Sequence, residues 1–206
     1  MQKVITKKGN SKSLTFSTPH VLKSILLLSS QQYVSRASFC QELKIGEGAV
    51  RTLISHLKEA GLVESIKAGT FLTKKGKRFA EYFREIMPSQ TFLKKCCLTN
   101  GKHNSAILLK SAFIDDIGNG MQQRDYAIIY GASDSLTLIY RKGEFVFCGD
   151  KVVCFPDEPE IRDDLIQALE PEEEDIVIIT SSDDKFVADI SSINTALLTI
   201  GAHEKH

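Results

Sequence analysis

The sequence lacks the features that mark secreted, membrane-spanning and disulfide-bonded proteins. No apolar run approaches the roughly 18 residues that a membrane span requires. Residues 1–12 are basic and polar, unlike a secretion signal. The five cysteines are an odd number and include no Cys-x-x-Cys pair. We therefore expect a cytoplasmic protein with reduced cysteines and no membrane partner.

Signatures of catalysis and of cofactor binding are also missing. No Gly-rich phosphate loop lies between an expected strand and the helix after it. No Ser/His/Asp or Cys/His set identifies a nucleophile, and Cys148 and Cys154 do not have the spacing of a zinc site. The sequence therefore favours a protein that is not an enzyme, with no cofactor and no bound metal.

Charge is distributed unevenly along the 206 residues, although the formal net charge is zero. Residues 1–97 carry 17 Lys+Arg and 6 Asp+Glu, a net charge of +11, whereas residues 98–206 carry 9 and 20, a net charge of −11. We expect two domains, at 1–90 and 91–206, of which the first is suited to a polyanion. A second interpretation, in which the two halves only attract each other, remains open.

The most informative pattern lies between residues 45 and 73. Val50, Leu53, Ile54 and Leu57 follow the i, i+3, i+4, i+7 spacing of one helical face, which predicts a helix at about 47–60. Gly61 is placed to end it. Residues 62–67 and 70–72 then read as two short strands around a tight turn.

The neighbouring segments complete a recognisable order of elements. Helices are expected from residue 18, at 36–43 and from about 74 to 87, and the last of them follows the sequence L-T-x-x-G at 72–76. This order resembles the winged-helix transcription factors of bacteria and archaea. The resemblance implies that the helix at 47–60 enters the major groove of double-stranded DNA and that the hairpin, or wing, touches the backbone or the minor groove.

The resemblance also assigns candidate DNA-binding residues. Those placed to reach base edges are Gly48, Arg51, Thr52 and Ser55. Arg51 is the most informative, because a guanidinium group pairs bidentately with guanine. The candidates for phosphate contacts are Lys44, Lys58, Lys67, Lys74, Lys75, Lys77 and Arg78. Glu47 and Glu59 lie near the same surface and weaken binding by one copy, so a homodimer is expected.

The second half reads as a strand, a helix, a hairpin, a helix, a strand and a closing helix, after a connector at 89–102. This mixture predicts an α+β domain in two layers, with helices on one face of a mainly antiparallel sheet. Gln123, Arg124 and Asp125, beside a Gly-rich loop, are candidates to bind a small-molecule effector. The alternative is an internal Arg–Asp pair on a surface helix.

Two stretches of the second half carry a further resemblance. N-G-M-Q-Q-R-D-Y-A-I-I-Y-G-A at 119–132 and T-L-I-Y-R-K-G-E at 137–144 resemble an archaeal family of uncharacterised proteins. That family joins an N-terminal winged helix to a small C-terminal α+β domain. Its motifs are not diagnostic of any activity.

The sequence as a whole predicts a DNA-binding transcriptional regulator whose C-terminal domain dimerises or senses a ligand. Two alternatives remain open. One is an adaptor whose winged helix binds protein and reads no DNA, and the other is an enzyme housed in the acidic half. A DNA-binding assay across salt concentrations separates the regulator from the adaptor, because phosphate contacts with DNA weaken as salt rises.

Overall fold

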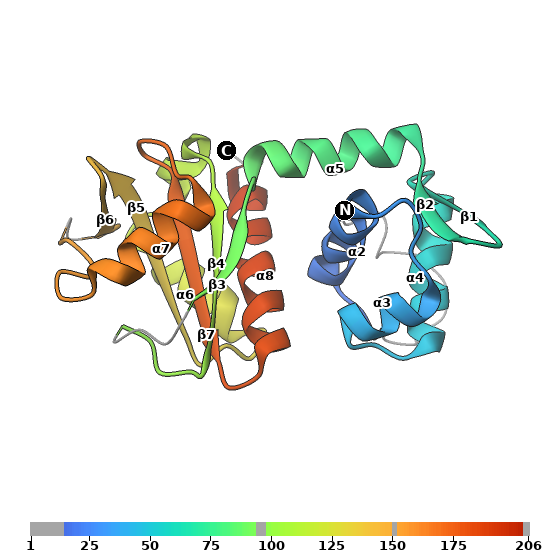
Figure 1. The fold of residues 1–206 in the computed structure, drawn as a ribbon, viewed down its shortest axis with the longest axis horizontal. Helices are drawn as coiled ribbons and strands as arrows, with labels where there is room; N and C mark the ends of the chain where they lie inside the picture. The colour runs from blue at the N-terminus through green and yellow to red at the C-terminus, as the bar shows by residue number, and fades with distance from the viewer. Residues whose placement is uncertain (1–14, 94–97, 150–151, 204–206) are drawn as a thin grey trace. The chain divides into compact units, whose positions relative to one another are not determined.

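The computed structural model describes residues 15–93, 98–149 and 152–203 and divides the chain into two compact units (Figure 1). The boundary between the units falls between Phe83 and Arg84, inside helix α5 (Lys74–Ile86). The sequence-based boundary after residue 90 lies a few residues later. Each unit has its own hydrophobic core.

The first unit contains helices, a two-stranded hairpin and the start of α5. Its elements are α2 (Thr18–Ser30), α3 (Arg36–Leu43), α4 (Glu47–Glu59), β1 (Val63–Ile66), β2 (Gly69–Leu72) and α5. Ser35 caps α3, since its hydroxyl accepts a hydrogen bond from the amide of Ser38 at 3.1 Å. Lys44 ends α3 in a left-handed conformation, with φ of 52°. The chain therefore turns sharply between α3 and α4.

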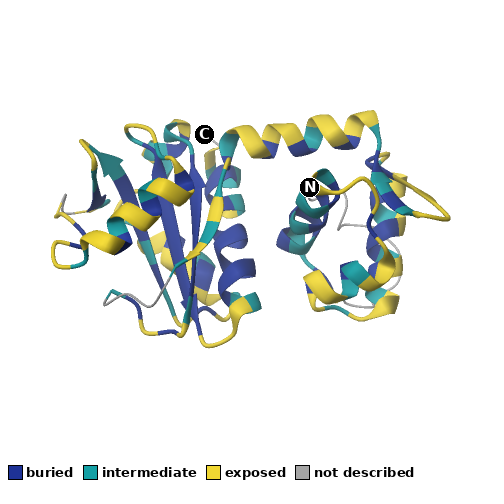
Figure 2. Cartoon of the chain, viewed as in Figure 1, coloured by how far each residue is buried: buried dark blue, intermediate teal, exposed yellow. Residues whose placement is uncertain are grey.

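One face of α4 is buried in the core of the first unit. Val50, Leu53 and Leu57 are fully buried and pack in the same cluster as Phe39 and Leu43 of α3. The apolar spacing in the sequence is therefore confirmed as a core-facing stripe. Because that face is fixed against the core, the opposite face of α4 points outward (Figure 2).

The β1–β2 hairpin is held against the segment between α2 and α3. Its strands are antiparallel, with Val63 opposite Leu72. Val34 exchanges two backbone hydrogen bonds with Thr70, at 2.9 and 3.0 Å. At the other end, the ammonium group of Lys75 donates to the carbonyl of Ala60 at 2.8 Å, which joins the start of α5 to the end of α4. The hairpin and α4 are thus fixed beside each other.

The second unit is built on a five-stranded sheet in which all neighbouring strands are antiparallel. The strand order is β3-β4-β7-β5-β6. The strands are β3 (Gln90–Leu93), β4 (His103–Leu109), β5 (Asp134–Arg141), β6 (Glu144–Phe147) and β7 (Ile176–Ser182). The helices are the 3-10 helix η1 (Ser111–Asp116), α6 (Met121–Ile128), α7 (Pro159–Leu169) and α8 (Lys185–His203). The predicted α+β class with antiparallel pairing is confirmed.

Helices cover both faces of this sheet, so the predicted two-layer arrangement is wrong. Leu108 and Val177 pack with Leu165 of α7 on one face. On the other face, Ser105 contacts Ser192 of α8 through their hydroxyl groups at 3.1 Å. Successive residues of a strand point to opposite faces, and Ser105 and Leu108 differ by an odd number of positions. The unit therefore has three layers, with α7 on one side of the sheet and α6 and α8 on the other.

Candidate functional site

The outward face of α4 carries small polar side chains. Gly48 and Ser55 are exposed and Thr52 is half-buried. Thr52 donates its hydroxyl hydrogen to the carbonyl of Gly48 at 3.1 Å, within its own helix. A methyl group built on Gly48 would have no neighbour within 4 Å, so the glycine does not serve packing inside the unit. The side chains on this face are short and polar, and the backbone at Gly48 is open to a partner.

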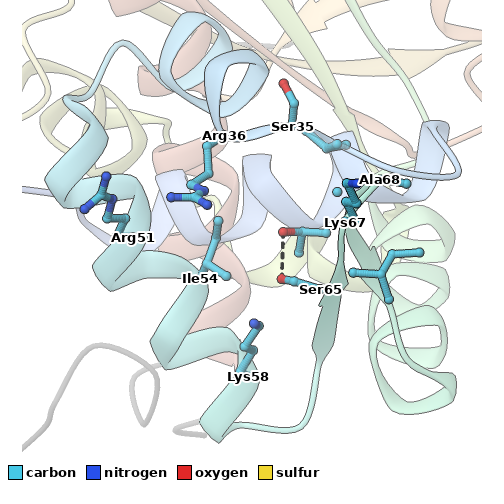
Figure 3. A pocket seen from close by; sticks show the side chains of 12 residues that line it. Ser35, Arg36, Arg51, Ile54, Lys58, Ser65, Lys67 and Ala68 are labelled. Atoms are coloured by element: carbon cyan, nitrogen blue, oxygen red, sulfur yellow. Dashed lines mark hydrogen bonds between the residues drawn. The ribbon is translucent and has the colours of Figure 1, made fainter.

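A groove of about 310 Å³ lies between α4, the hairpin and the start of α3 (Figure 3). Of the described residues that line it, four are cationic and none is acidic. The cationic residues come from two helices, α3 and α4, and from the turn between β1 and β2: Arg36, Arg51, Lys58 and Lys67. Ser35 and Ser65 add hydroxyl groups to the same lining. We refer to this feature as the α4–hairpin groove, and its chemistry suits an anion.

Glu47, in the first turn of α4, is held beside two of the groove's arginines. Its Oε1 atom lies 2.7 Å from Nη2 of Arg51 and 3.8 Å from Nη1 of Arg36. The hydrogen bond from Arg51 and the charges of both arginines keep the pKa of Glu47 below its ordinary value. Glu47 is therefore an anion at neutral pH, beside the positive charges of the groove.

The groove brings together only part of the predicted DNA-binding set. Arg51, Lys58 and Lys67 line it, whereas the remaining predicted cations do not: Lys44, Lys74, Lys75, Lys77 and Arg78. These five are exposed on the surface, and Lys75 is engaged with the end of α4 as described above.

Most of the residues that line the groove were not predicted from the sequence as site residues, and Arg36 and Ile54 are the most informative of them. Arg36 is the first residue of α3, where no motif draws attention to it. Ile54 was assigned to the core, and it is buried but also lines the groove. Arg36 lies beside the groove because α3 packs against α4 through Phe39 and Leu43.

The residues predicted to bind an effector do not converge. Gln123 is buried and donates to the carbonyl of Asp116 at 3.2 Å. Arg124 is exposed and lies 3.7 Å from Asp134 at the start of β5, and Asp125 is exposed. Consecutive residues of a helix are about 100° apart, so these three side chains leave α6 in different directions. The Arg–Asp pair that forms is with Asp134.

Among the described residues, no helix has both the length and the apolar character to cross a membrane.

The fold and the groove define a two-domain protein with a helical, hairpin-bearing N-terminal part and an antiparallel α/β/α C-terminal part. Residues 20–78 match the family profile described as the PH0730-like, N-terminal domain. Residues 100–200 match that of a domain of unknown function, DUF4443. The two matches follow each other along the chain in that order.

One solved structure is similar over both domains. It is the hypothetical protein PH0730 from Pyrococcus horikoshii OT3, with a TM-score of 0.72 and 25% sequence identity. The likeness covers 91% of this chain and 94% of that one. No curated protein matches this chain.

Proposed function

We propose that the first unit is a winged helix and that the protein is a DNA-binding transcriptional regulator. In this proposal α4 is the recognition helix and the β1–β2 hairpin is the wing. The observation that carries it is the α4–hairpin groove, whose cationic groups come from both of these elements and from α3.

The electrostatics of the groove support a nucleic-acid partner. Arg36, Arg51, Lys58 and Lys67 are exposed and can each neutralise a phosphate. The groove belongs to the half of the chain that carries the net charge of +11. Neutralising phosphates releases counterions, which gives affinity for any duplex and makes that affinity fall as salt rises.

The outer face of α4 supports sequence readout. Gly48, Thr52 and Ser55 are short side chains, so the helix axis can come close to base edges in the major groove. Arg51 is long enough to donate to a guanine from the flank of the same face. Base contacts would then select the sequence, while the lysines hold the protein in place on the backbone.

The second unit contains the acidic half of the chain. We propose that it dimerises the protein or senses a ligand. Two copies would present two recognition helices and raise the affinity that Glu47 and Glu59 reduce. We propose no catalytic role for it. A regulator of this kind acts in the cytoplasm, on chromosomal DNA.

The test is binding of the full chain to labelled random-sequence duplex DNA, followed by fluorescence anisotropy over a series of salt concentrations. The parent should bind at low salt and lose affinity steadily as salt increases. Each of Arg36→Ala, Arg51→Ala and Lys58→Ala should weaken binding. Arg36→Ala and Lys58→Ala, which remove phosphate contacts, should each also reduce the slope of log K against log salt by about one.

A matched control is Arg124→Ala in the second unit. Arg124 is exposed and paired with a carboxylate, as Arg51 is, but it lies outside the groove. Its removal should leave DNA binding unchanged. Parent-like binding by all three groove variants, or salt-independent binding by the parent, would refute the proposal.

A second candidate is a protein-binding adaptor, which one observation favours. Ile66, at the end of β1, is 52% exposed and lines the groove together with Val34, Ile54 and Ala68, and apolar side chains gathered in one groove suit a protein partner. An adaptor predicts that Ile66→Ser disrupts its complexes and that the parent fails to bind duplex DNA at any salt concentration.

A further inference from the structure

Glu47 is an acidic residue on the surface that is proposed to meet a polyanion. Its side chain is 58% exposed, and it stands at the first position of α4, where a recognition helix comes closest to the bases. A carboxylate at this point repels phosphate and lowers affinity for DNA in general. Its presence therefore calls for a specific role.

Helix stability does not explain Glu47 well. An acid in the first turn interacts favourably with the helix dipole, and an i,i+4 pair with Arg51 adds a little more. Both effects are small for exposed side chains. Neither needs an arginine that lines the groove, nor a second arginine from α3.

The geometry leaves both partners able to bind a base while they stay paired. A guanidinium group has five N–H donors, and the contact with Glu47 uses one nitrogen, Nη2. A carboxylate has two oxygens, and among the described residues both arginines approach the same one, Oε1. The second oxygen, Oε2, can accept another hydrogen bond.

We propose that Glu47 is a specificity-determining residue that accepts a hydrogen bond from the N4 amino group of a cytosine, while Arg51 donates to a guanine at a neighbouring base pair. The two residues lie one helical turn apart on the side of α4 that lines the groove. Carboxylates accept from cytosine N4 and arginine pairs with guanine O6 and N7. The preferred site then contains a G and a C within a step or two of each other.

This inference rests on the proposed function, and it predicts a change in the sequence that is bound. Glutamine pairs with adenine through its N6 and N7 atoms. Glu47→Gln should therefore shift the preference at the cytosine position towards adenine, by about tenfold. Glu47→Ala should remove the preference there and keep the guanine.

The matched control is Glu59→Gln, at the last position of α4. This variant removes one negative charge from the same helix, as Glu47→Gln does, but twelve residues away along the chain. If charge alone matters, both glutamine variants will bind all duplexes more tightly and to the same extent. Only Glu47→Gln should change the base preference.

The experiment selects duplexes with a randomised centre using the full-length parent, Glu47→Gln, Glu47→Ala, Glu59→Gln and Arg51→Ala, and sequences the bound DNA. The inference is supported if the parent enriches a G and a nearby C, Glu47→Gln replaces the C preference by A, and Arg51→Ala loses the G. It is overturned if the parent enriches a site that Glu47→Gln enriches unchanged.

Two other outcomes separate the inference from the proposed function. If the parent binds duplexes without enriching any sequence, DNA binding stands and base readout by Glu47 is refuted. If the parent binds no duplex even at low salt, the proposed function fails and the inference fails with it. Circular dichroism of each variant checks that α4 is intact.

Discussion

The ammonium group of Lys110 lies 2.9 Å from Oδ2 of Asp175, a side chain that is only 1% exposed. The same carboxylate accepts backbone hydrogen bonds from Ser111 at 3.0 Å and from Glu172 at 2.9 Å. It therefore joins the end of β4, the start of η1 and the loop before β7. Burial alone would lower the pKa of Lys110, but hydrogen bonds to Glu172 and Asp175 raise it.

We expect Asp175→Ala to lower the free energy of unfolding by about 3 kcal/mol, because it removes the acceptor of three buried or half-buried donors. Glu172→Ala is the control, since Glu172 contacts the same ammonium at 2.8 Å but is 79% exposed. Its loss should cost less than about 1 kcal/mol. Urea unfolding of both variants gives the comparison, and equal losses would contradict the role of burial.

Cys154 should be inert to thiol reagents in the folded protein. Its side chain is buried, and burial, with a smaller effect of Cys148, raises its pKa to about 12. Because the thiolate is the nucleophile, iodoacetamide at pH 8 should modify half-buried Cys148 and leave Cys154 intact until the protein is unfolded. Peptide mass spectrometry distinguishes the two sites. Early alkylation of Cys154 would contradict its burial.

The raised pKa of Cys154 also predicts a pH dependence of stability. In the unfolded chain the thiol loses its proton near its ordinary value of 9.0, whereas in the folded protein it keeps the proton to about 12. The stability that the neutral thiol contributes is present below pH 9 and is lost as the pH rises through that window. Cys154→Ala should lose stability less steeply over the same range, as measured by urea unfolding.

Local sequence patterns anticipated the first unit well, because its elements are short-range structures. The helix predicted at about 47–60 agrees with α4, and the predicted strands agree with the hairpin to within one or two residues. Helical periodicity and turn residues carry this information locally. The same reasoning assigned 89–102 to a connector, although Gln90–Leu93 forms the edge strand β3.

The arrangement of the second unit could not be read from local patterns. The residues of β3 alternate between exposed and half-buried, so they form no apolar run. Their strand exists because of pairing with β4 and a hydrogen bond of 2.8 Å from Gln90 to Asp189 of α8, which is distant in the chain. The helical layer on each face depends on the same long-range contacts. Strand order and layering are properties of the assembled sheet.

The candidate site shows the same division. Arg51 and Lys58 are recognisable on α4 because the apolar stripe fixes which side points outward. Arg36 is not, since it reaches the groove only through the packing of another helix. In the opposite direction, Gln123, Arg124 and Asp125 are adjacent in sequence and diverge in space, because neighbours on a helix point different ways.

Thr73 should stabilise the junction between the hairpin and α5. Its hydroxyl donates to the carbonyl of Gly61 at 2.7 Å and accepts from the amide of Gly76 at 3.0 Å, as an N-cap does. Thr73→Ala should lower the free energy of unfolding by about 1 kcal/mol, because it removes the capping hydroxyl. Thr73→Ser keeps the hydroxyl and should lower it by roughly a few tenths of a kcal/mol. Chemical denaturation measures both. A serine variant as unstable as the alanine variant would show that the methyl group matters instead.

Gly76 and Gly48 are both helical glycines, but they should respond in opposite ways to alanine. A methyl group on Gly76 would lie 2.0 Å from the carbonyl oxygen of Leu62, which is backbone and cannot move aside easily, whereas Gly48 has open space. Gly76→Ala should destabilise the protein by about 1–3 kcal/mol through overpacking. Gly48→Ala should stabilise it by about 0.5–1 kcal/mol, because alanine is the better helix former.

Thermal unfolding of the two alanine variants beside the parent tests this contrast. A DNA-binding measurement on Gly48→Ala also tests how closely α4 approaches the bases. If α4 approaches base edges closely, the added methyl group should weaken binding while it raises stability. An equally stable Gly76→Ala would contradict the close approach of α5 to the backbone of Leu62, directly before β1. That approach explains physically why the L-T-x-x-G sequence has a glycine at its last position.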